Sequence, residues 1–297
     1  MTKKKGWYER VEQARITSDW VKLNCNNITD REMELLRIIH KRKYVRRDHL
    51  EVIHPAYRDI PNGAIVLNRS IRKLFEKMCI DKVHEQTGYK EGNKPCIVAL
   101  DRAGAIILGV RFNRRIKQHK TVKGGNIHVH KREVPIQFFH VNGVNQLEVD
   151  TIRFCIKNEW KLVRWDIEVA RKFMYNKENI KLSPDVFMIM GIGKKPLISF
   201  VEYDTGTEDR GNSKNFPMIE EKLNKYRKFR QSGHWMKEGW FKRLKEAGFP
   251  LIIFVTEDER RLDFVKKKGD EFKLQVEVVL SKDYIRLLEK LKANLLG

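Results

Sequence analysis

Apolar residues in the first third of the chain recur at helical spacing and then give way to two short extended runs. Thr29 and Glu32 have the spacing of a capping box, which opens the first of the helices. In the third helix Ile71, Leu74 and Met78 recur at the spacing of one helix face. The expected elements are a helix from residue 29 to the basic run 41–47, helices over 47–53 and 68–78, extended runs at 80–85 and 95–100, and a helix over 100–109.

The second half alternates between strand and helix patterns. This alternation predicts a sheet covered by helices, so the fold class is α/β locally and α+β for the whole chain. The expected elements are a helix over 135–157, strands at 162–165, 185–190 and 197–203, helices over 217–230 and 236–246, a strand at 251–256, a helix over 258–267, a strand at 275–280 and a helix over 282–295.

The charge balance points to a polyanionic partner. The chain carries 61 Lys and Arg against 39 Asp and Glu, a net charge of +22, of which +14 falls in residues 1–130 and +8 in residues 131–297. A surplus of this size favours nucleic acid through Coulomb attraction and counterion release. The 41–47 run and residues 111–125, which are rich in Arg and Lys and contain a Gly-Gly pair, concentrate much of that charge.

Three helices followed by a basic hairpin predict an N-terminal winged helix-turn-helix whose third helix enters the major groove of double-stranded DNA. The alternative is a three-helix scaffold with a solvated basic face. We expect domains over 1–110 and 131–297, joined by a basic linker over 111–130. The candidate DNA-binding residues are Arg46, Arg47, Asn68, Arg69, Arg72, Lys73, Lys77, Arg114, Arg115 and Lys117.

The candidate chemistry lies on a predicted hairpin in the second half. If Met190 pairs with Leu197 across the glycine-rich turn, Asp185 faces Glu202 on the neighbouring strand. Asp204, two residues further on, points to the same face. Facing carboxylates repel one another unless a cation compensates them, and a hard divalent ion such as Mg²⁺ or Mn²⁺ is the usual partner of oxygen ligands. The alternative is a structural turn at the end of a strand.

Lys222 is the candidate cationic group. The helix over 217–230 has an apolar arc, and Lys222 falls inside it whereas Lys225 lies at its edge. A lysine on a buried helix face needs a partner, and the carboxylates are the obvious one. The alternative is that Lys222 extends along the protein to the surface beside Tyr226.

These residues resemble two known groups. The order of elements, with Pro184-Asp185 and Glu202-x-Asp204, resembles the core of PD-(D/E)XK nucleases, although Asp204 stands where that superfamily carries lysine and Lys222 looks like the displaced lysine of some members. Over roughly residues 28–270 the layout is similar to the replication-relaxation family of bacterial plasmids and mobile elements. The features behind this likeness are the winged helix, the Leu100-Asp-Arg-Ala-Gly104 helix, His130, and Pro184-Asp185 leading to Glu202-x-Asp204-x-Gly-Thr207.

What the resemblance implies is DNA binding in plasmid replication or relaxation, by a winged helix and a nuclease-like mixed sheet flanked by helices. If the second domain cleaves or nicks DNA, Asp185, Glu202 and Asp204 would hold the metal and Lys222 would stabilise the charge that develops on the phosphate. The absence of lysine at position 204 favours the alternative, a catalytically inactive initiator or transcriptional regulator. The sequence leaves open whether the chain forms a homodimer.

Two histidines and two tryptophans in the sequence allow other interpretations. His128 and His130 share a strand face, as in the metal site of HUH nickases, but no five-stranded HUH sheet is recognisable and Tyr175 and Tyr226 are loosely placed as nucleophiles. Trp235 and Trp240 could stack on a base, although covering the sheet is the commoner role. The four cysteines are scattered and no apolar run is long enough for a membrane helix, which favours a cytoplasmic protein with reduced thiols.

Overall fold

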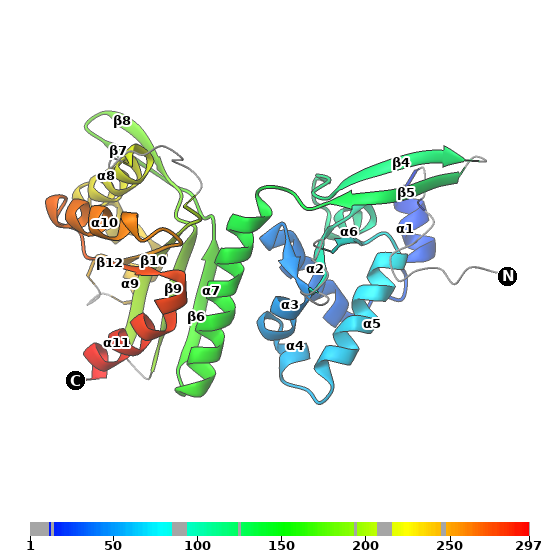
Figure 1. Ribbon diagram of the computed structural model, residues 1–297, viewed down its shortest axis with the longest axis horizontal. Helices are drawn as coiled ribbons and strands as arrows, with labels where there is room; N and C mark the ends of the chain where they lie inside the picture. The colour runs from blue at the N-terminus through cyan, green and yellow to red at the C-terminus, as the bar shows by residue number, and fades with distance from the viewer. Residues whose placement is uncertain are drawn as a thin grey trace. The chain divides into compact units, whose positions relative to one another are not determined.

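A computed structural model of the chain has a mixed α/β fold, as the sequence predicts, divided into two compact units (Figure 1). Unit 1 spans Met1–Asn145 and unit 2 spans Gln146–Gly297. The structure describes residue 12 and residues 15–84, 94–123, 126–192, 195–206, 216–244 and 248–296. No helix in these described stretches has the length and apolar character needed to cross a membrane.

Unit 1 begins with helices that pack around a small sheet. Its elements are α1 (Ser18–Asn24), α2 (Asp30–Arg42), β1 (Val45–Arg46), α3 (Arg47–Ile53), α4 (Pro55–Arg58), α5 (Gly63–Glu76), β2 (Ile80–Val83), β3 (Ile97–Leu100), α6 (Arg102–Leu108), β4 (Lys117–Lys123) and β5 (Asn126–Glu133). The strands β1, β3 and β2 pair in that order, all antiparallel. The predicted capping box opens α2: Thr29 N–H donates to Glu32 at 2.9 Å, and Glu32 N–H donates to the Thr29 hydroxyl at 3.3 Å.

The third long helix, α5, starts earlier than the predicted 68. It begins at Gly63, directly after Asn62 in the left-handed region at φ 59°. A Cβ at position 63 would lie 1.7 Å from the Tyr57 carbonyl oxygen, so only glycine allows this approach. Leu67, Ile71 and Leu74 are buried along its inner face. Residue 85, the expected end of the first extended run, lies outside the described residues.

Residues 117–133, expected to lie largely within a linker, form an antiparallel ribbon of β4 and β5 (Figure 1). Hydrogen bonds to Asp81 hold the base of the ribbon against β2. Arg132 Nε donates to Asp81 at 2.8 Å, and Gln118 donates to the other Asp81 oxygen at 2.5 Å. The division between the units falls between Asn145 and Gln146, later in the chain than the predicted linker over 111–130. The sequence did not predict this strand pairing because most residues of the segment are polar.

Unit 2 is built on a five-stranded mixed sheet in the order β12-β11-β10-β9-β6. The pairs β6–β9 and β9–β10 are antiparallel, whereas β10–β11 and β11–β12 are parallel. A separate hairpin, β7–β8, was not predicted. The elements are α7 (Phe138–Lys157, which starts in unit 1), β6 (Lys161–Ile167), β7 (Arg171–Tyr175), β8 (Glu178–Leu182), β9 (Val186–Ile192), β10 (Lys195–Asp204), α8 (Pro217–Gln231), α9 (Gly239–Arg243), β11 (Leu251–Thr256), α10 (Arg260–Glu271), β12 (Val276–Leu280) and α11 (Tyr284–Leu296).

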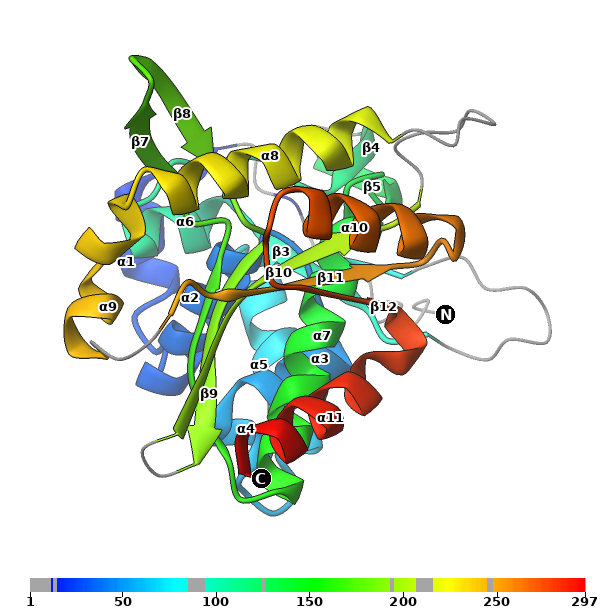
Figure 2. The ribbon, with the colours of Figure 1, turned by 90° about the vertical axis from the view of Figure 1, so that its left-hand side faces the viewer.

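Helices cover both faces of this sheet (Figure 2). On one face α8 and α10 pack over alternate strand residues, and Phe200 and Phe254 join Leu223, Phe229 and Val265 in the core. On the other face lie α11 and the part of α7 from Gln146 onward, which are joined by a buried 2.9 Å hydrogen bond between the Thr151 and Tyr284 hydroxyls. The α8 face is the one that bears the candidate carboxylates.

Candidate functional site

The β9–β10 pairing has the predicted register. Leu197 pairs with Met190 and Val201 pairs with Val186. The next position brings Asp185, just before β9, beside Glu202. The Asp185 backbone N–H donates to Glu202 Oε2 at 3.3 Å, and the Tyr203 backbone N–H donates to Asp185 Oδ2 at 2.9 Å. The two carboxylates are therefore fixed by the backbone of the opposing strand.

Lys222 joins this pair from α8. Its Nζ contacts Glu202 Oε2 directly and lies 3.5 Å from Asp185 Oδ2. The helix face predicts this position, because Ile219, Leu223 and Tyr226 on the same side are buried. Lys225, predicted at the edge of that face, instead forms a 2.6 Å surface ion pair within the helix.

Glu202 is the most enclosed member of the group, with 1% of its surface exposed. Its Oε1 accepts a hydrogen bond from the hydroxyl of Tyr226, itself fully buried. Burial raises the pKa of Glu202 to about 8; Lys222 opposes this shift and Asp185 adds to it. The pKa of Lys222 is also raised: burial acts against its charge, but Glu202 and Asp185 together outweigh that effect.

Asp204 does not join this group. Its Oδ1 is paired with Arg261 on α10 and accepts from Gly206 N–H at 3.2 Å, while its Oδ2 accepts from the Thr256 hydroxyl at 2.8 Å. Arg261 is 1% exposed, so this is a buried ion pair. The expectation of three converging carboxylates is therefore wrong for Asp204. The nearby Thr207 lies outside the described residues.

Only part of the expected donor set suits a divalent cation. Within the described part of the chain, no three His, Cys, Asp or Glu side chains are grouped so that they could hold a metal ion. Asp185 and Glu202 provide two adjacent carboxylates, and Mg²⁺ is usually bound through one or two carboxylates together with substrate phosphates. In the structure the ammonium group of Lys222 compensates the negative charge of these two carboxylates. Asp185 and Glu202 thus fit a cation only if Lys222 moves, and Asp204 does not fit.

Two partners of the site were missed in the sequence. Tyr226 lies four residues after Lys222, so helical spacing could have placed both on the carboxylates. Arg261 lies 57 residues from Asp204, and no local pattern connects the two.

In unit 1, the outer face of α5 carries part of the predicted DNA-binding set. Asn68, Arg69 and Arg72 are exposed there. Arg72 forms a 2.9 Å pair with Glu76, with both side chains more than half exposed. A pair of this kind is weak and can be exchanged for a phosphate.

Other members of the predicted set hold unit 1 together. Lys73 donates to Glu32 and to the Asn27 carbonyl oxygen, both at 2.6 Å, and Lys77 donates to the Asn24 carbonyl oxygen. Their ammonium groups are thus directed toward α1 and α2.

The two arginines at the start of α3 are likewise engaged. Arg47 donates to Asn68 at 2.9 Å and pairs with Glu51 at 2.6 Å, and Arg46 pairs with Asp48 at 2.8 Å.

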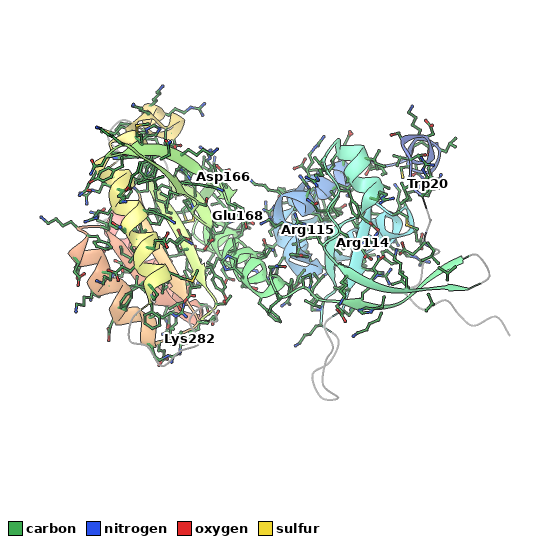
Figure 3. All side chains as sticks on the ribbon, turned by 90° about the horizontal axis from the view of Figure 1, so that it is seen from above. Trp20, Arg114, Arg115, Asp166, Glu168 and Lys282 are labelled. Atoms are coloured by element: carbon green, nitrogen blue, oxygen red, sulfur yellow. The ribbon has the colours of Figure 1, made fainter. Side chains whose placement is uncertain are left out.

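The remaining members lie at the start of the ribbon, where Figure 3 labels Arg114 and Arg115. The guanidinium of Arg114 lies 5.5 Å from the centre of the Phe112 ring, and the Arg115 carbonyl oxygen accepts from Tyr44. Lys117 forms a 3.1 Å ion pair with Glu133 across the ribbon.

The alternative patterns find little support in the geometry. The side chains of His128 and His130 lie outside what the structure describes, but their strand β5 pairs with β4 in a two-stranded sheet. Tyr226 is buried against Glu202, and the Tyr175 hydroxyl donates to Gln231. Trp235 stacks on the buried Trp240, consistent with a cover over the sheet.

Comparison with known proteins gives one family match. The sequence pattern of the replication-relaxation family matches residues 36–244. No curated protein matches the chain. Two solved structures of the restriction endonuclease FokI, the second of them bound to DNA, align at 10% identity with TM-scores of 0.28 and 0.25. Each alignment covers 96% of this chain and 48% of the FokI chain, so this protein spans about half the length of that enzyme. These TM-scores are too low to support an argument about fold or activity.

Proposed function

We infer function from the premise that this chain belongs to the replication-relaxation family, and we propose that it binds double-stranded DNA in the replication or relaxation of bacterial plasmids or mobile elements. The family match supports a DNA-related role. The net charge of +22 supports the same partner, because every phosphate neutralised releases a counterion.

The proposed DNA-binding element is a winged helix in unit 1. Helices α2, α3 and α5 would form the helical part, and the antiparallel strands β2 and β3 would form the base of the wing. In such a module the third helix enters the major groove. The order of elements and the short strand β1 between α2 and α3 support this assignment.

The observation that carries the proposal is the difference between the two faces of α5. Leu67, Ile71 and Leu74 are buried against unit 1, whereas Asn68, Arg69 and Arg72 are exposed on the outer side. Asparagine and arginine are the side chains that pair with adenine and guanine edges in the major groove. An exposed helix face with these residues can therefore contact both bases and phosphates.

The test is equilibrium binding of the full chain to a labelled DNA duplex, measured by fluorescence anisotropy over a series of salt concentrations. We expect an affinity that falls linearly with the logarithm of salt concentration, as ion release requires. Failure to bind any duplex at low salt would overturn the proposal.

The grouping of Asp185, Glu202 and Lys222 favours a second candidate function, DNA cleavage or nicking by unit 2. The contacts of Lys222 with Asp185 and Glu202 support this candidate, in which Lys222 would take the role of the displaced lysine of some PD-(D/E)XK nucleases. Asp185 and Glu202 would hold Mg²⁺ or Mn²⁺, which would polarise the phosphodiester. Lys222 would be released toward the phosphate charge when a cation replaces it between the carboxylates.

The competing possibility is a nuclease-like scaffold without activity, as expected for an initiator or transcriptional regulator. It is favoured by the buried ion pair between Asp204 and Arg261, which keeps Asp204 apart from the other two carboxylates. Incubation of supercoiled plasmid with the full chain and Mg²⁺ or Mn²⁺ separates the two. Nicked or linear product that disappears in Asp185→Ala supports cleavage, whereas intact plasmid at protein concentrations that saturate DNA binding supports the scaffold.

A further inference from the structure

Two cysteines from distant parts of unit 1 meet inside its core. The sulfur atoms of Cys25 and Cys79 lie 3.9 Å apart, although 54 residues separate them in the chain. Both are buried, with 8% of Cys25 and none of Cys79 exposed. The scattered positions of the cysteines in the sequence gave no indication of this contact.

The backbone around the two sulfurs is well defined. Cys25 caps the end of α1, and its N–H donates to the Val21 carbonyl oxygen at 2.8 Å. Cys79 follows α5; its N–H donates to Leu74 at 2.9 Å and its carbonyl oxygen accepts from Asp101 N–H at 2.9 Å. Both thiols also approach the Lys77 carbonyl oxygen, at 3.8 and 3.5 Å.

We propose that Cys25 and Cys79 are an oxidisable dithiol that forms an intramolecular disulfide when the protein meets a hydroperoxide. A disulfide has a sulfur–sulfur bond of about 2.05 Å, so the sulfurs must approach by about 2 Å from their present 3.9 Å. The seven-residue helix α1 is the shorter of the two attached elements, and a small shift of its end supplies the movement.

The reaction balances with one hydroperoxide per dithiol. The Cys25 thiolate attacks a peroxide oxygen, the O–O bond breaks, and the leaving oxygen takes up a proton to give water or an alcohol. Cys25 is then a sulfenic acid. The Cys79 sulfur attacks the Cys25 sulfur, its proton passes to the departing hydroxyl, and water leaves. The two thiols lose two electrons and the peroxide gains them.

Cys25 is the better first nucleophile. It is the more exposed of the two, and the thiolate rather than the thiol attacks. The hydrogen bond from Cys79 and the nearby Lys77 ammonium lower the pKa of Cys25 to about 7 despite burial, whereas the pKa of Cys79 is raised. Cys155, buried in unit 2, has its pKa raised to about 11 by burial and serves as an internal comparison.

The test uses the full chain in which Cys96 and Cys155 are replaced by serine, so that the pair contains all the thiols. After removal of reductant and treatment with hydrogen peroxide, free thiols are alkylated and the peptides are mapped by mass spectrometry. We expect both thiols to be lost together, a peptide joining Cys25 to Cys79 in the monomeric fraction, and full recovery after dithiothreitol. This chemistry does not depend on the proposed DNA binding, which the duplex titration tests separately.

Matched variants make the result decisive. In Cys25→Ser and in Cys79→Ser, each made in the otherwise wild-type chain, the joining peptide should be absent. In the unsubstituted protein Cys155 should remain alkylatable after the pair is consumed. Retention of both thiols in protein with a native circular dichroism spectrum would overturn the proposal. So would conversion of Cys25 to sulfinic acid without the cross-linked peptide.

Discussion

The ammonium group of Lys222 on α8 lies against the enclosed carboxylate of Glu202 on β10. This contact connects the helix layer of unit 2 to the strand end that bears Asp185. Glu202 is almost fully buried, and this burial is the largest influence on its pKa, followed by Lys222 and Asp185. A change of charge in this pair should therefore alter the stability of this corner of the sheet.

Removal of the lysine charge should destabilise unit 2. Above pH 8, where Glu202 is ionised, Lys222→Met leaves its carboxylate buried without its cation, and breaking a buried pair in this way costs about 3 kcal/mol, less where water can reach the site. The measurement is urea unfolding of the full chain followed by tryptophan fluorescence. Lys225→Met is the matched control on the same helix, because its surface pair with Glu221 is worth only about 0.5 kcal/mol.

Equal urea midpoints for Lys222→Met and Lys225→Met would show that Lys222 extends to solvent, the alternative that its position in the sequence left open.

The raised pKa of Glu202 predicts a specific dependence of stability on pH. Its folded-state value of about 8 lies above the ordinary value of 4.5, so between these values the native state binds more protons than the unfolded state. Stability should therefore fall as the pH rises from about 4.5 to 8, by up to about 5 kcal/mol from this group. In Glu202→Gln this part of the pH dependence should vanish when melting temperatures are compared with the wild type across the range. Parallel profiles would contradict it.

Local patterns were sufficient to predict much of the carboxylate site. The glycine-rich turn and the two apolar runs beside it determine the β9–β10 register, and that register brings Asp185 to Glu202. Helical spacing then places Lys222 toward them. The ion pair of Asp204 could not be predicted in this way, because its partner Arg261 belongs to a helix that packs over the sheet only in the folded chain.

The same limit applies in unit 1. Amphipathic spacing predicted α2 and α5 but not which basic residues remain available to a ligand. Lys73 and Lys77 are basic residues of the kind that binds DNA, and yet their ammonium groups are bound to α2 and to the end of α1. The ribbon over 117–133 was missed because its strands are mostly polar, and an alternation of apolar and polar residues is the usual signal of a strand.

The outer face of α5 gives a quantitative prediction for DNA binding. Replacing Arg69 and Arg72 together with alanine removes two exposed charges, which should lower the slope of log affinity against log salt concentration by about 2 units or slightly less. Lys73→Gln with Lys77→Gln removes the same charge from the side that faces α1 and α2, and the slope should be almost unchanged. A larger loss in the lysine variant would place the DNA on that side and contradict the assignment of the helix face.

The ribbon of unit 1 should depend on one arginine. Arg132 is about 10% exposed and pairs with Asp81 at 2.8 Å and with Glu12 at 3.2 Å, both of which are nearly buried. Arg132→Met leaves two enclosed carboxylates without this cation, a change expected to cost about 3 kcal/mol or more. The ribbon should then separate from β2, and trypsin should cut at Lys117 and Lys120, which the paired strands protect in the wild type.

Lys131→Met has the same charge change at an exposed neighbour and should leave the digestion pattern intact. Rapid cleavage at Lys117 and Lys120 in the wild-type protein would instead mean that the segment behaves in solution as the linker its composition suggests.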